Sequence, residues 1–166
     1  MTAAATLCAA AGGGALALVP IASRPSPVLL WNVSQSAPVG LYRVRPDASL
    51  RSGDMVAAFA PEEIRALAAE RGYVPSSVPL VKRLAAAKGD LVCASGPTLR
   101  VNGQVMALRL MRDLRGRALP WWRGCRRLRG GELLLLGRGA NSFDGRYFGP
   151  IGTRALVGKV VLLWRP

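Results

Sequence analysis

The chain has 166 residues, a formal net charge of +14 and no histidine. Without histidine it cannot build a Ser-His-Asp triad, a Cys-His pair or a histidine-containing zinc site, so a catalytic serine would need a lysine or an N-terminal amine as its base. The sequence holds three lysines, Lys82, Lys88 and Lys159.

The N-terminal segment predicts a membrane anchor. Residues 3–22 are uncharged, rich in Ala and Gly, and long enough to cross a bilayer as a helix. We therefore expect an anchor over residues 1–24 and one folded domain over residues 25–166. A cleaved signal peptide is the alternative, with Ala22 as the small residue near the cut, although no basic region precedes the apolar run. The first charges after the run, starting at Arg24, favour a cytoplasmic domain by the positive-inside rule.

The rest of the chain predicts a mainly β domain, because short apolar runs are divided by Gly, Pro and Asp. The pair Asn102-Gly103 predicts a hairpin between residues 99–101 and 104–106. One soluble helix is predicted over Pro61–Arg71, which has a proline and two glutamates in its first turn and a glycine just beyond. The predicted strands are residues 28–33, 54–59, 79–86, 90–94, 132–136 and 155–164.

Residues 32–42, NVSQSAPVGLY, place Ser36 in a polar turn. Pro38 fixes one backbone dihedral and Gly40 permits an unusual one, so we expect the serine on a stiff turn. Its backbone N–H could then face an oxyanion, and the Ser34 hydroxyl would supply a second donor. A plain polar turn, with Ser34 as a turn hydrogen-bonder, is the alternative interpretation.

Lys82 lies in a predicted strand in which Leu80, Lys82 and Leu84 share one face. Apolar neighbours desolvate an amine and lower its pKa. Lowering the pKa from roughly 10.4 by about 2 to 3 would bring the neutral amine within reach at pH 7 to 8, where it could serve as a base. A lysine that covers apolar surface with its aliphatic chain is the alternative.

Three segments in a fixed order carry a family resemblance. Residues 32–42, residues 79–90 (PLVKRLAAAKGD) and residues 141–150 (NSFDGRYFGP) resemble the motifs of membrane-bound signal peptidases of the serine-lysine type, most closely the conjugative-transfer (TraF-type) branch. The resemblance runs from Trp31 to Trp164. It implies a catalytic Ser36 and Lys82, an oxyanion hole made by Ser34 and Ser36, and site-supporting residues Ser142, Asp144 and Arg146.

Two positions depart from the pattern of the family. Gly145 stands where many relatives have serine, and GRGA before Asn141 replaces the acidic and arginine-rich sequence found there in general signal peptidases. The second departure favours the conjugative branch. Asp144 and Arg146 are also compatible with an ordinary, partly buried ion pair.

The resemblance also implies a function. It indicates a membrane-anchored serine endopeptidase with a coiled β-sheet domain on the periplasmic side of the bacterial inner membrane, acting on exported pilin-like precursors without metal or cofactor. This orientation is opposite to the one that the charges after residues 3–22 favour, and we follow the resemblance because large domains cross the membrane despite such charges. The acyl-enzyme on Ser36 would be resolved either by water or by the substrate's own amino terminus, which would give a cyclic pilin. A general type I signal peptidase and a noncatalytic basic module tethered to the membrane are the alternatives. A self-cleaving repressor with the same dyad would need a DNA-binding domain where this chain has its apolar segment.

Eight of the twenty arginines lie between Arg109 and Arg129, with Trp121 and Trp122 among them. Such a cluster is compatible with a nucleic-acid-binding surface, with a membrane surface, or with a solvated loop in a chain from an arginine-rich genome. No helix-turn-helix, zinc finger or RNA-binding aromatic motif accompanies it. We therefore expect no nucleic-acid partner.

Two cysteines, Cys93 and Cys125, lie in the predicted domain, and Cys8 lies in the apolar segment. We expect Cys93 and Cys125 to form a disulfide in an oxidising compartment, where closing the loop between them would contribute roughly 3 to 4 kcal/mol. Two free thiols are the alternative.

Overall fold

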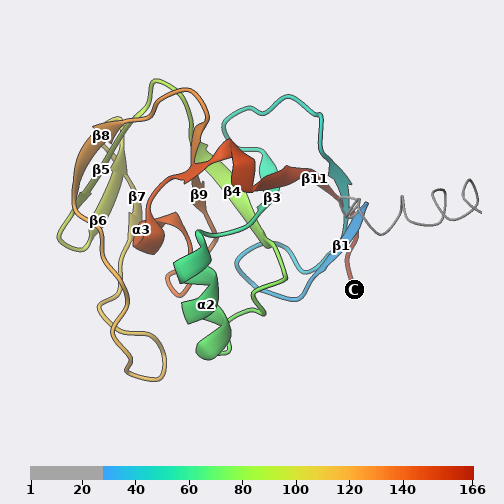
Figure 1. Ribbon diagram of the computed structural model, residues 1–166, viewed down its shortest axis with the longest axis horizontal. Coiled ribbons are helices and arrows are strands. Elements are labelled where there is room, and N and C mark those ends of the chain that lie inside the picture. Colours follow the sequence, from blue (N-terminus) through green and yellow to red (C-terminus); the bar gives the residue numbers. More distant parts are fainter. Residues whose placement is uncertain (1–27) are drawn as a thin grey trace, which may run out of the picture.

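Two antiparallel sheets form the framework of residues 28–166, the part of the chain that the computed structural model describes (Figure 1). The larger sheet has seven strands in the order β1-β2-β11-β3-β4-β9-β10, and the smaller sheet has four in the order β7-β6-β5-β8. The prediction of a mainly β domain is therefore confirmed. The predicted anchor over residues 1–24 lies outside the described residues, and none of the helices within 28–166 has the length and hydrophobicity to cross a membrane.

All six predicted apolar runs form strands, and the Asn102-Gly103 turn joins two strands as expected. The larger sheet consists of β1 (Leu29–Asn32), β2 (Gly40–Arg45), β3 (Met55–Ala58), β4 (Leu80–Ala86), β9 (Glu132–Leu136), β10 (Ile151–Gly152) and β11 (Leu156–Trp164). The smaller sheet consists of β5 (Leu91–Ser95), β6 (Thr98–Val101), β7 (Gln104–Leu108) and β8 (Gly124–Arg127). The helices are α2 (Glu62–Glu70), α3 (Gly145–Phe148) and the 3₁₀ turn η1 (Thr153–Ala155).

Strand β9 belongs to the core on both of its faces. Leu134 and Leu136 pack in a cluster with Leu99 of the smaller sheet, whereas Leu133 and Leu135 pack in a cluster built on β3 and β4. This explains why β9 reads as an unbroken leucine run rather than as an alternating pattern. The segment that follows β9 is therefore held against the centre of the fold.

Helix α2 agrees with its prediction. Its first turn carries Glu62 and Glu63, which are favourable at the positive end of a helix dipole, and Pro61 precedes it. It ends at Glu70, and Gly72 follows with a φ of 69°. The chain then returns toward β4 through a loop that reaches the cleft described below.

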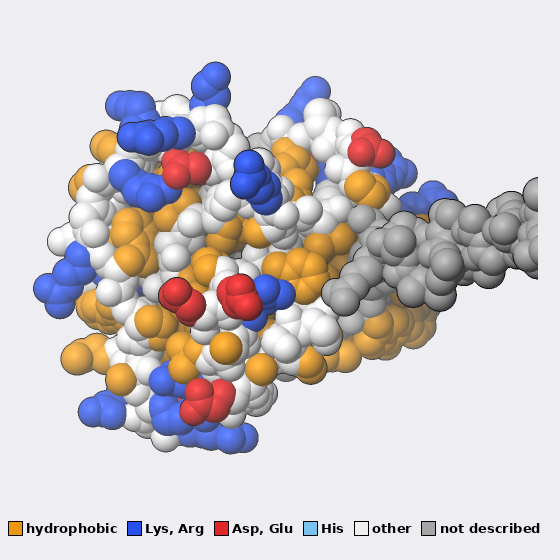
Figure 2. All heavy atoms as spheres, viewed as in Figure 1, with side chains coloured by type: hydrophobic (Ala, Val, Ile, Leu, Met, Phe, Trp, Pro, Cys, Tyr) orange, Lys and Arg blue, Asp and Glu red, His pale blue; other side chains and the backbone are white. Residues whose placement is uncertain are grey.

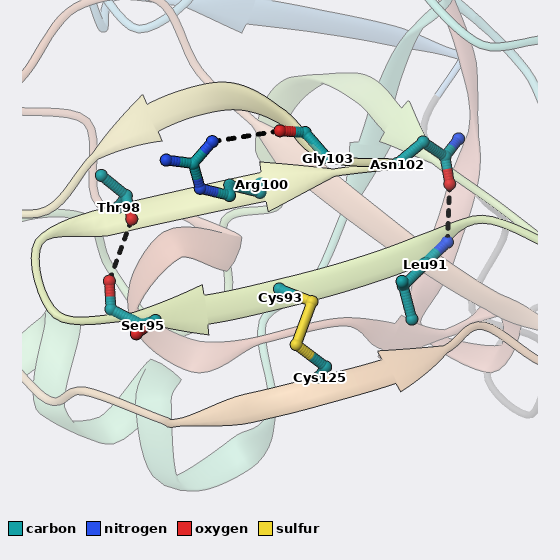
Figure 3. Close-up of a disulfide and its surroundings, with 8 residues drawn as sticks. All are labelled: Leu91, Cys93, Ser95, Thr98, Arg100, Asn102, Gly103 and Cys125. Atoms are coloured by element: carbon teal, nitrogen blue, oxygen red, sulfur yellow. Dashed lines mark hydrogen bonds between the residues drawn. A yellow bond between two sulfur atoms is a disulfide. The ribbon is translucent and has the colours of Figure 1, made fainter.

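A disulfide joins the middle strand β5 to the edge strand β8 (Figure 3). Cys93 and Cys125 are direct partners in the antiparallel register of these strands. The expected pairing is therefore confirmed. Strand β8 itself was not predicted, because all four of its residues are exposed and it has no apolar pattern.

The two ends of the described chain meet at one edge of the larger sheet. Strand β2 pairs with β1 on one side and with β11 on the other, and the ring centroids of Trp31 and Trp164 lie 5.6 Å apart. The C-terminus accordingly lies beside β1 in Figure 1. Gly40 begins β2 with a φ of +146°, and a Cβ there would lie 2.1 Å from the Trp164 carbonyl oxygen. The expected unusual dihedral at Gly40 is thus present, and the close approach of β11 requires it.

Candidate active site

A cleft of about 770 Å³ collects residues from distant parts of the sequence. Its walls come from β1 and the turn after it, the start of β4, the loop after α2, the loop between β7 and β8, and residues 138–143. Four of the predicted site residues line it, namely Ser34, Ser36, Lys82 and Ser142. Asp144 and Arg146 lie beneath it, in the buried core.

The turn that carries Ser36 is held together by the side chain of Asn32. Its amide Nδ2 donates to the carbonyl oxygens of Ser34 at 2.9 Å, of Pro38 at 3.0 Å and of Ala37 at 3.3 Å. Its Oδ1 accepts from the Ser34 N–H at 3.2 Å. Asn32 is itself buried, so it satisfies backbone groups that a tight turn leaves unpaired. Asn32 had no separate signal in the sequence beyond its place at the start of the 32–42 segment.

Within this turn, Ser34 and Ser36 are hydrogen-bonded to each other. Their Oγ atoms lie 2.8 Å apart, and the backbone N–H of Ser36 donates to Ser34 Oγ at 3.2 Å. The two groups expected as oxyanion donors therefore lie side by side, with the Ser36 N–H directed at the Ser34 hydroxyl. A reacting carbonyl oxygen would have to replace that contact.

Lys82 is buried in β4, with 3% of its surface exposed. Its Nζ donates to Ser142 Oγ at 3.0 Å, and the hydrogen bonds among the described residues include none between Lys82 and Ser36. Burial lowers the pKa of the Lys82 amine to about 8; the nearby Asp144 carboxylate opposes this effect and Arg146 adds to it. A buried amine of this kind is neutral in a large fraction of molecules at mildly alkaline pH.

The other two lysines have different surroundings. Lys88 is exposed to solvent. Lys159 forms a half-exposed ion pair with Asp54, with 2.8 Å between Nζ and Oδ1. Among the three lysines, Lys82 alone lines the cleft.

Gly137 allows two serines to approach each other. A Cβ built on Gly137 would lie 2.1 Å from Ser142 Oγ and 3.0 Å from Ser36 Cβ, so the two serine side chains face each other across this glycine. The Ser142 hydroxyl that accepts from Lys82 is thereby brought next to Ser36. Sequence reasoning missed Gly137, whose only signal was a glycine directly after the leucine run of β9.

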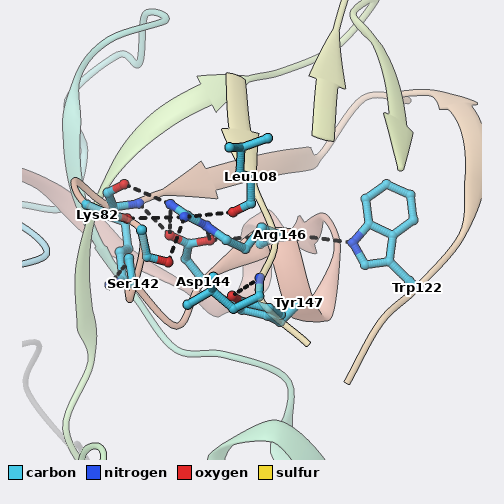
Figure 4. A network of polar contacts seen from close by, with 12 residues as sticks. Lys82, Leu108, Trp122, Ser142, Asp144, Arg146 and Tyr147 are labelled. Carbon is cyan, nitrogen blue, oxygen red and sulfur yellow. Dashed lines mark hydrogen bonds and ion pairs between the residues drawn. The ribbon is translucent and has the colours of Figure 1, made fainter. Parts of the chain in front are cut away.

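Asp144 and Arg146 form the buried network that holds this glycine in place (Figure 4). Their ion pair has contacts of 2.9 Å (Nε to Oδ1) and 3.1 Å (Nη2 to Oδ2), and the side chains are 4% and 0% exposed for Arg146 and Asp144. Asp144 accepts the Gly137 N–H at 2.7 Å, and Arg146 donates to the Gly137 carbonyl at 3.1 Å. Arg146 also donates to the carbonyls of Leu108, Gly139 and Ala140. The pair is thus fully rather than partly buried.

The two tryptophans of the arginine-rich segment, residues 109–129, contact other residues of the domain. Trp121 and Trp122 are half-buried, and their indole N–H groups donate to the carbonyls of Leu110 and Gly145 at 2.9 and 3.1 Å. Arg109 is buried, lies 4.4 Å over the Trp121 ring and donates to the Trp122 carbonyl at 2.6 Å. These tryptophans therefore fix the loop between β7 and β8.

Chemically, the cleft offers a serine hydroxyl, two possible donors to an oxyanion and a desolvated amine. Such a set can perform acyl transfer, with the amine taking and returning a proton. Within residues 28–166 there is no cluster of three or more Cys, Asp or Glu side chains arranged to hold a metal ion.

Comparison with known proteins gives consistent matches. Residues 1–165 match a family model described as signal peptidase, peptidase S26. One plasmid transfer protein TraF from Escherichia coli is 35% identical over 147 residues, covering 80% of this chain and 82% of the relative. A second is 34% identical over 169 aligned positions, covering 93% and 94%. A signal peptidase I structure from Enterococcus faecalis V583 covers 69% of this chain and 98% of its own, with a TM-score of 0.41 and 17% identity.

Proposed function

This chain belongs to the signal peptidase family, peptidase S26, and on that premise we propose that it is a serine endopeptidase in which Ser36 is the nucleophile and Lys82 the general base. The family resemblance read from the sequence is confirmed by these matches. The observation that carries the proposal is the buried Lys82 amine with its pKa lowered to about 8, in the same cleft as Ser36. In a chain without histidine, this amine is the base best suited to accept a serine proton.

The reaction follows from these groups. The neutral Lys82 amine takes the proton of Ser36 Oγ as this oxygen attacks the carbonyl carbon of the scissile bond. The Ser36 N–H and the Ser34 hydroxyl exchange their mutual hydrogen bond for hydrogen bonds to the developing oxyanion. One such donor lowers the free energy of the transition state by on the order of 3 kcal/mol. Protonated Lys82 then gives its proton to the leaving amine, and an acyl-enzyme ester on Ser36 remains. Ser142, which accepts from Nζ at 3.0 Å, keeps the amine oriented through both steps.

The proposed substrate is an exported, pilin-like precursor, and the proposed setting is conjugative transfer at the bacterial inner membrane. Support comes from the two relatives named plasmid transfer protein and from the disulfide, which suits an oxidising compartment such as the periplasm. The uncharged run at residues 3–22 would anchor the domain to that membrane. A general signal peptidase acting on many precursors is the competing assignment.

The test is processing of a candidate precursor co-expressed with the full chain. We expect Ser36→Ala and Lys82→Ala each to abolish processing while circular dichroism shows a folded domain, and Lys88→Ala, at an exposed lysine, to process normally. The double variant should be no worse than either single one, because nucleophile and base act as one unit. Retained processing in Ser36→Ala would overturn the assignment.

The intact mass of the product separates the two fates of the acyl-enzyme. Hydrolysis gives a linear protein, whereas attack by the substrate's own amino terminus gives a cyclic protein that is lighter by one water. We propose precursor cleavage as the activity and cyclisation as its extension. A linear product alone would remove the extension and leave the peptidase in place.

A further inference from the structure

The cleft is strongly basic. Arg71, Arg115, Arg117 and Arg138 all line it, whereas Asp113 is the one carboxylate among the described residues of its walls. The whole sequence has 23 basic and 9 acidic residues, and on the face shown in Figure 2 Lys and Arg side chains are spread widely while acidic ones are few. A basic surface alone is therefore unremarkable here, and the question is which cleft arginines are available to a substrate.

The Asp113 carboxylate is fully occupied by its own loop and by the loop after α2. It accepts from the Tyr73 hydroxyl, from Arg117 Nε at 2.7 Å, and from the backbone N–H groups of Arg115 and Arg117 at 2.9 Å each. Desolvation would raise the pKa of Asp113, but these hydrogen bonds together hold it well below its usual range. Asp113 thus stays ionised and offers little charge to neutralise the other arginines.

Two of the four cleft arginines are also occupied. Arg117 binds Asp113 and donates to the Arg71 carbonyl at 3.3 Å, and Arg71 donates to the Ala118 carbonyl at 2.8 Å. These contacts tie the loop after α2 to the loop between β7 and β8, which gives the cleft a fixed far wall. The guanidinium groups of Arg71 and Arg117 are therefore engaged in contacts within the domain.

Arg115 and Arg138 differ from the other two. Both are exposed, and neither guanidinium makes a hydrogen bond or an ion pair with any other residue in the range 28–166. The backbone N–H of Arg138 donates to the Ser36 carbonyl at 2.7 Å, so this side chain starts directly beside the proposed nucleophile. Arg115 extends from the far wall.

We propose that Arg115 and Arg138 make the cleft select substrates that carry an acidic side chain near the scissile bond. The proposal rests on the proposed peptidase function and adds a charge rule to it. A carboxylate that meets an unpaired guanidinium in a partly enclosed cleft gains an ion pair and two parallel hydrogen bonds, and a substrate lysine meets repulsion. Because both arginines are exposed, the effect is modest, about fivefold for one pair at low salt, and it weakens as salt screens the charges.

The experiment uses the full chain in a neutral detergent and peptides of about twelve residues that span the precursor cleavage site. Both peptide ends are blocked, so that only side chains carry charge, and Glu, Gln or Lys is placed in turn at each position. We expect kcat/KM to fall in the order Glu, Gln, Lys at one or more positions, with the difference shrinking between about 0.02 and about 0.5 M salt. Arg115→Gln and Arg138→Gln should each lose most of the preference at the positions they contact. Arg100→Gln, on the exposed side of β6, should keep it.

Binding to Ser36→Ala, followed by fluorescence anisotropy, separates this proposal from the peptidase itself. A preference for the Glu peptide in binding supports the charge rule even where no cleavage is detected. Equal cleavage and equal binding of the three peptides would overturn the charge rule and leave the peptidase standing. Equal treatment of the peptides together with Arg115-dependent recruitment to anionic vesicles would overturn it in favour of a lipid-binding role.

Discussion

Two regions of this domain handle charge in opposite ways. Between β4, β9 and α3 the chain buries a lysine, an aspartate and an arginine, and stabilises them with short polar contacts. In the four-stranded sheet the arginines of β8 stay in water, and a disulfide links the strands instead. Removing charged groups from water is costly, but it changes their chemistry. In the first region burial lowers the pKa of the Lys82 amine, whereas in the second region a covalent bond constrains two neighbouring strands and the charges keep their solvent.

The largest effect is expected from breaking the buried pair. Asp144→Ala leaves Arg146 buried without its partner and the Gly137 N–H without its acceptor, so the free energy of unfolding should fall by about 3 to 5 kcal/mol. Urea unfolding followed by circular dichroism measures this loss. Asp54→Ala is the matched control, because it breaks a half-exposed pair with Lys159 and should cost about 1 kcal/mol or less. Equal losses in both variants would contradict the distinction between the two regions.

The second largest effect is expected from removing the disulfide. Replacing both Cys93 and Cys125 by serine should lower the free energy of unfolding by about 3 kcal/mol, because the unfolded chain regains the freedom of a loop with a sequence separation of 32. Processing by the folded protein should be unchanged, since the bond links β5 to β8, away from Ser36. Thiol titration of denatured, unreduced wild type should find neither cysteine free. A loss of processing at full stability would show that this sheet does more than stabilise.

The pH dependence of the rate tests the buried amine. Below about pH 8 Lys82 is increasingly protonated and cannot accept a proton, so kcat/KM should fall about tenfold per pH unit on the acid side and level off above pH 8. Between pH 9 and pH 6 the expected change is about a hundredfold. The substrate should have no group that titrates in this range. A flat profile from pH 5 to 9 would argue against a lysine base.

The smallest effect is expected from adding one methyl group at the site. Gly137→Ala places a Cβ against Ser142 and Ser36, so one serine must move and kcat/KM should fall about tenfold, less than the roughly hundredfold loss that a full 1 Å displacement can cause. Gly130→Ala is the control, because a Cβ there meets no atom within 4 Å. Normal activity in Gly137→Ala would mean that the spacing of the two serines is not critical.

The sequence was most informative where a local pattern has one structural outcome. Asn102-Gly103 forms its turn, with Asn102 at a φ of 49°, and Pro61 with two glutamates opens α2. The apolar neighbours of Lys82 in β4 predicted a desolvated amine, and the amine is buried. Local rules suffice in these cases, because the groups that decide the outcome are close in sequence.

Other features depend on how the folded chain brings groups together, and local patterns alone did not predict them. Asp144 and Arg146 were expected near the site only from the family resemblance, because they follow Lys82, whose pKa they adjust, by more than sixty residues. Asn32 reaches three carbonyls only once its turn has closed. Gly137 matters only because Ser36 and Ser142 meet beside it. Strand β8 has no apolar pattern because all four of its residues are exposed. It is an edge strand whose place in the sheet depends on its pairing with β5.

The neighbouring Trp31 and Trp164 rings, tilted by 32° to each other, offer a spectroscopic probe of the whole domain. The two indoles belong to the first and last strands of the described chain, so their contact exists only when β11 is docked beside β2. Any exciton signal from this pair in near-ultraviolet spectra would therefore report whether β11 is paired with β2 in the larger sheet. A fluorophore attached after Pro166 would sit beside β1 and sense the surroundings of the point where the chain enters the domain.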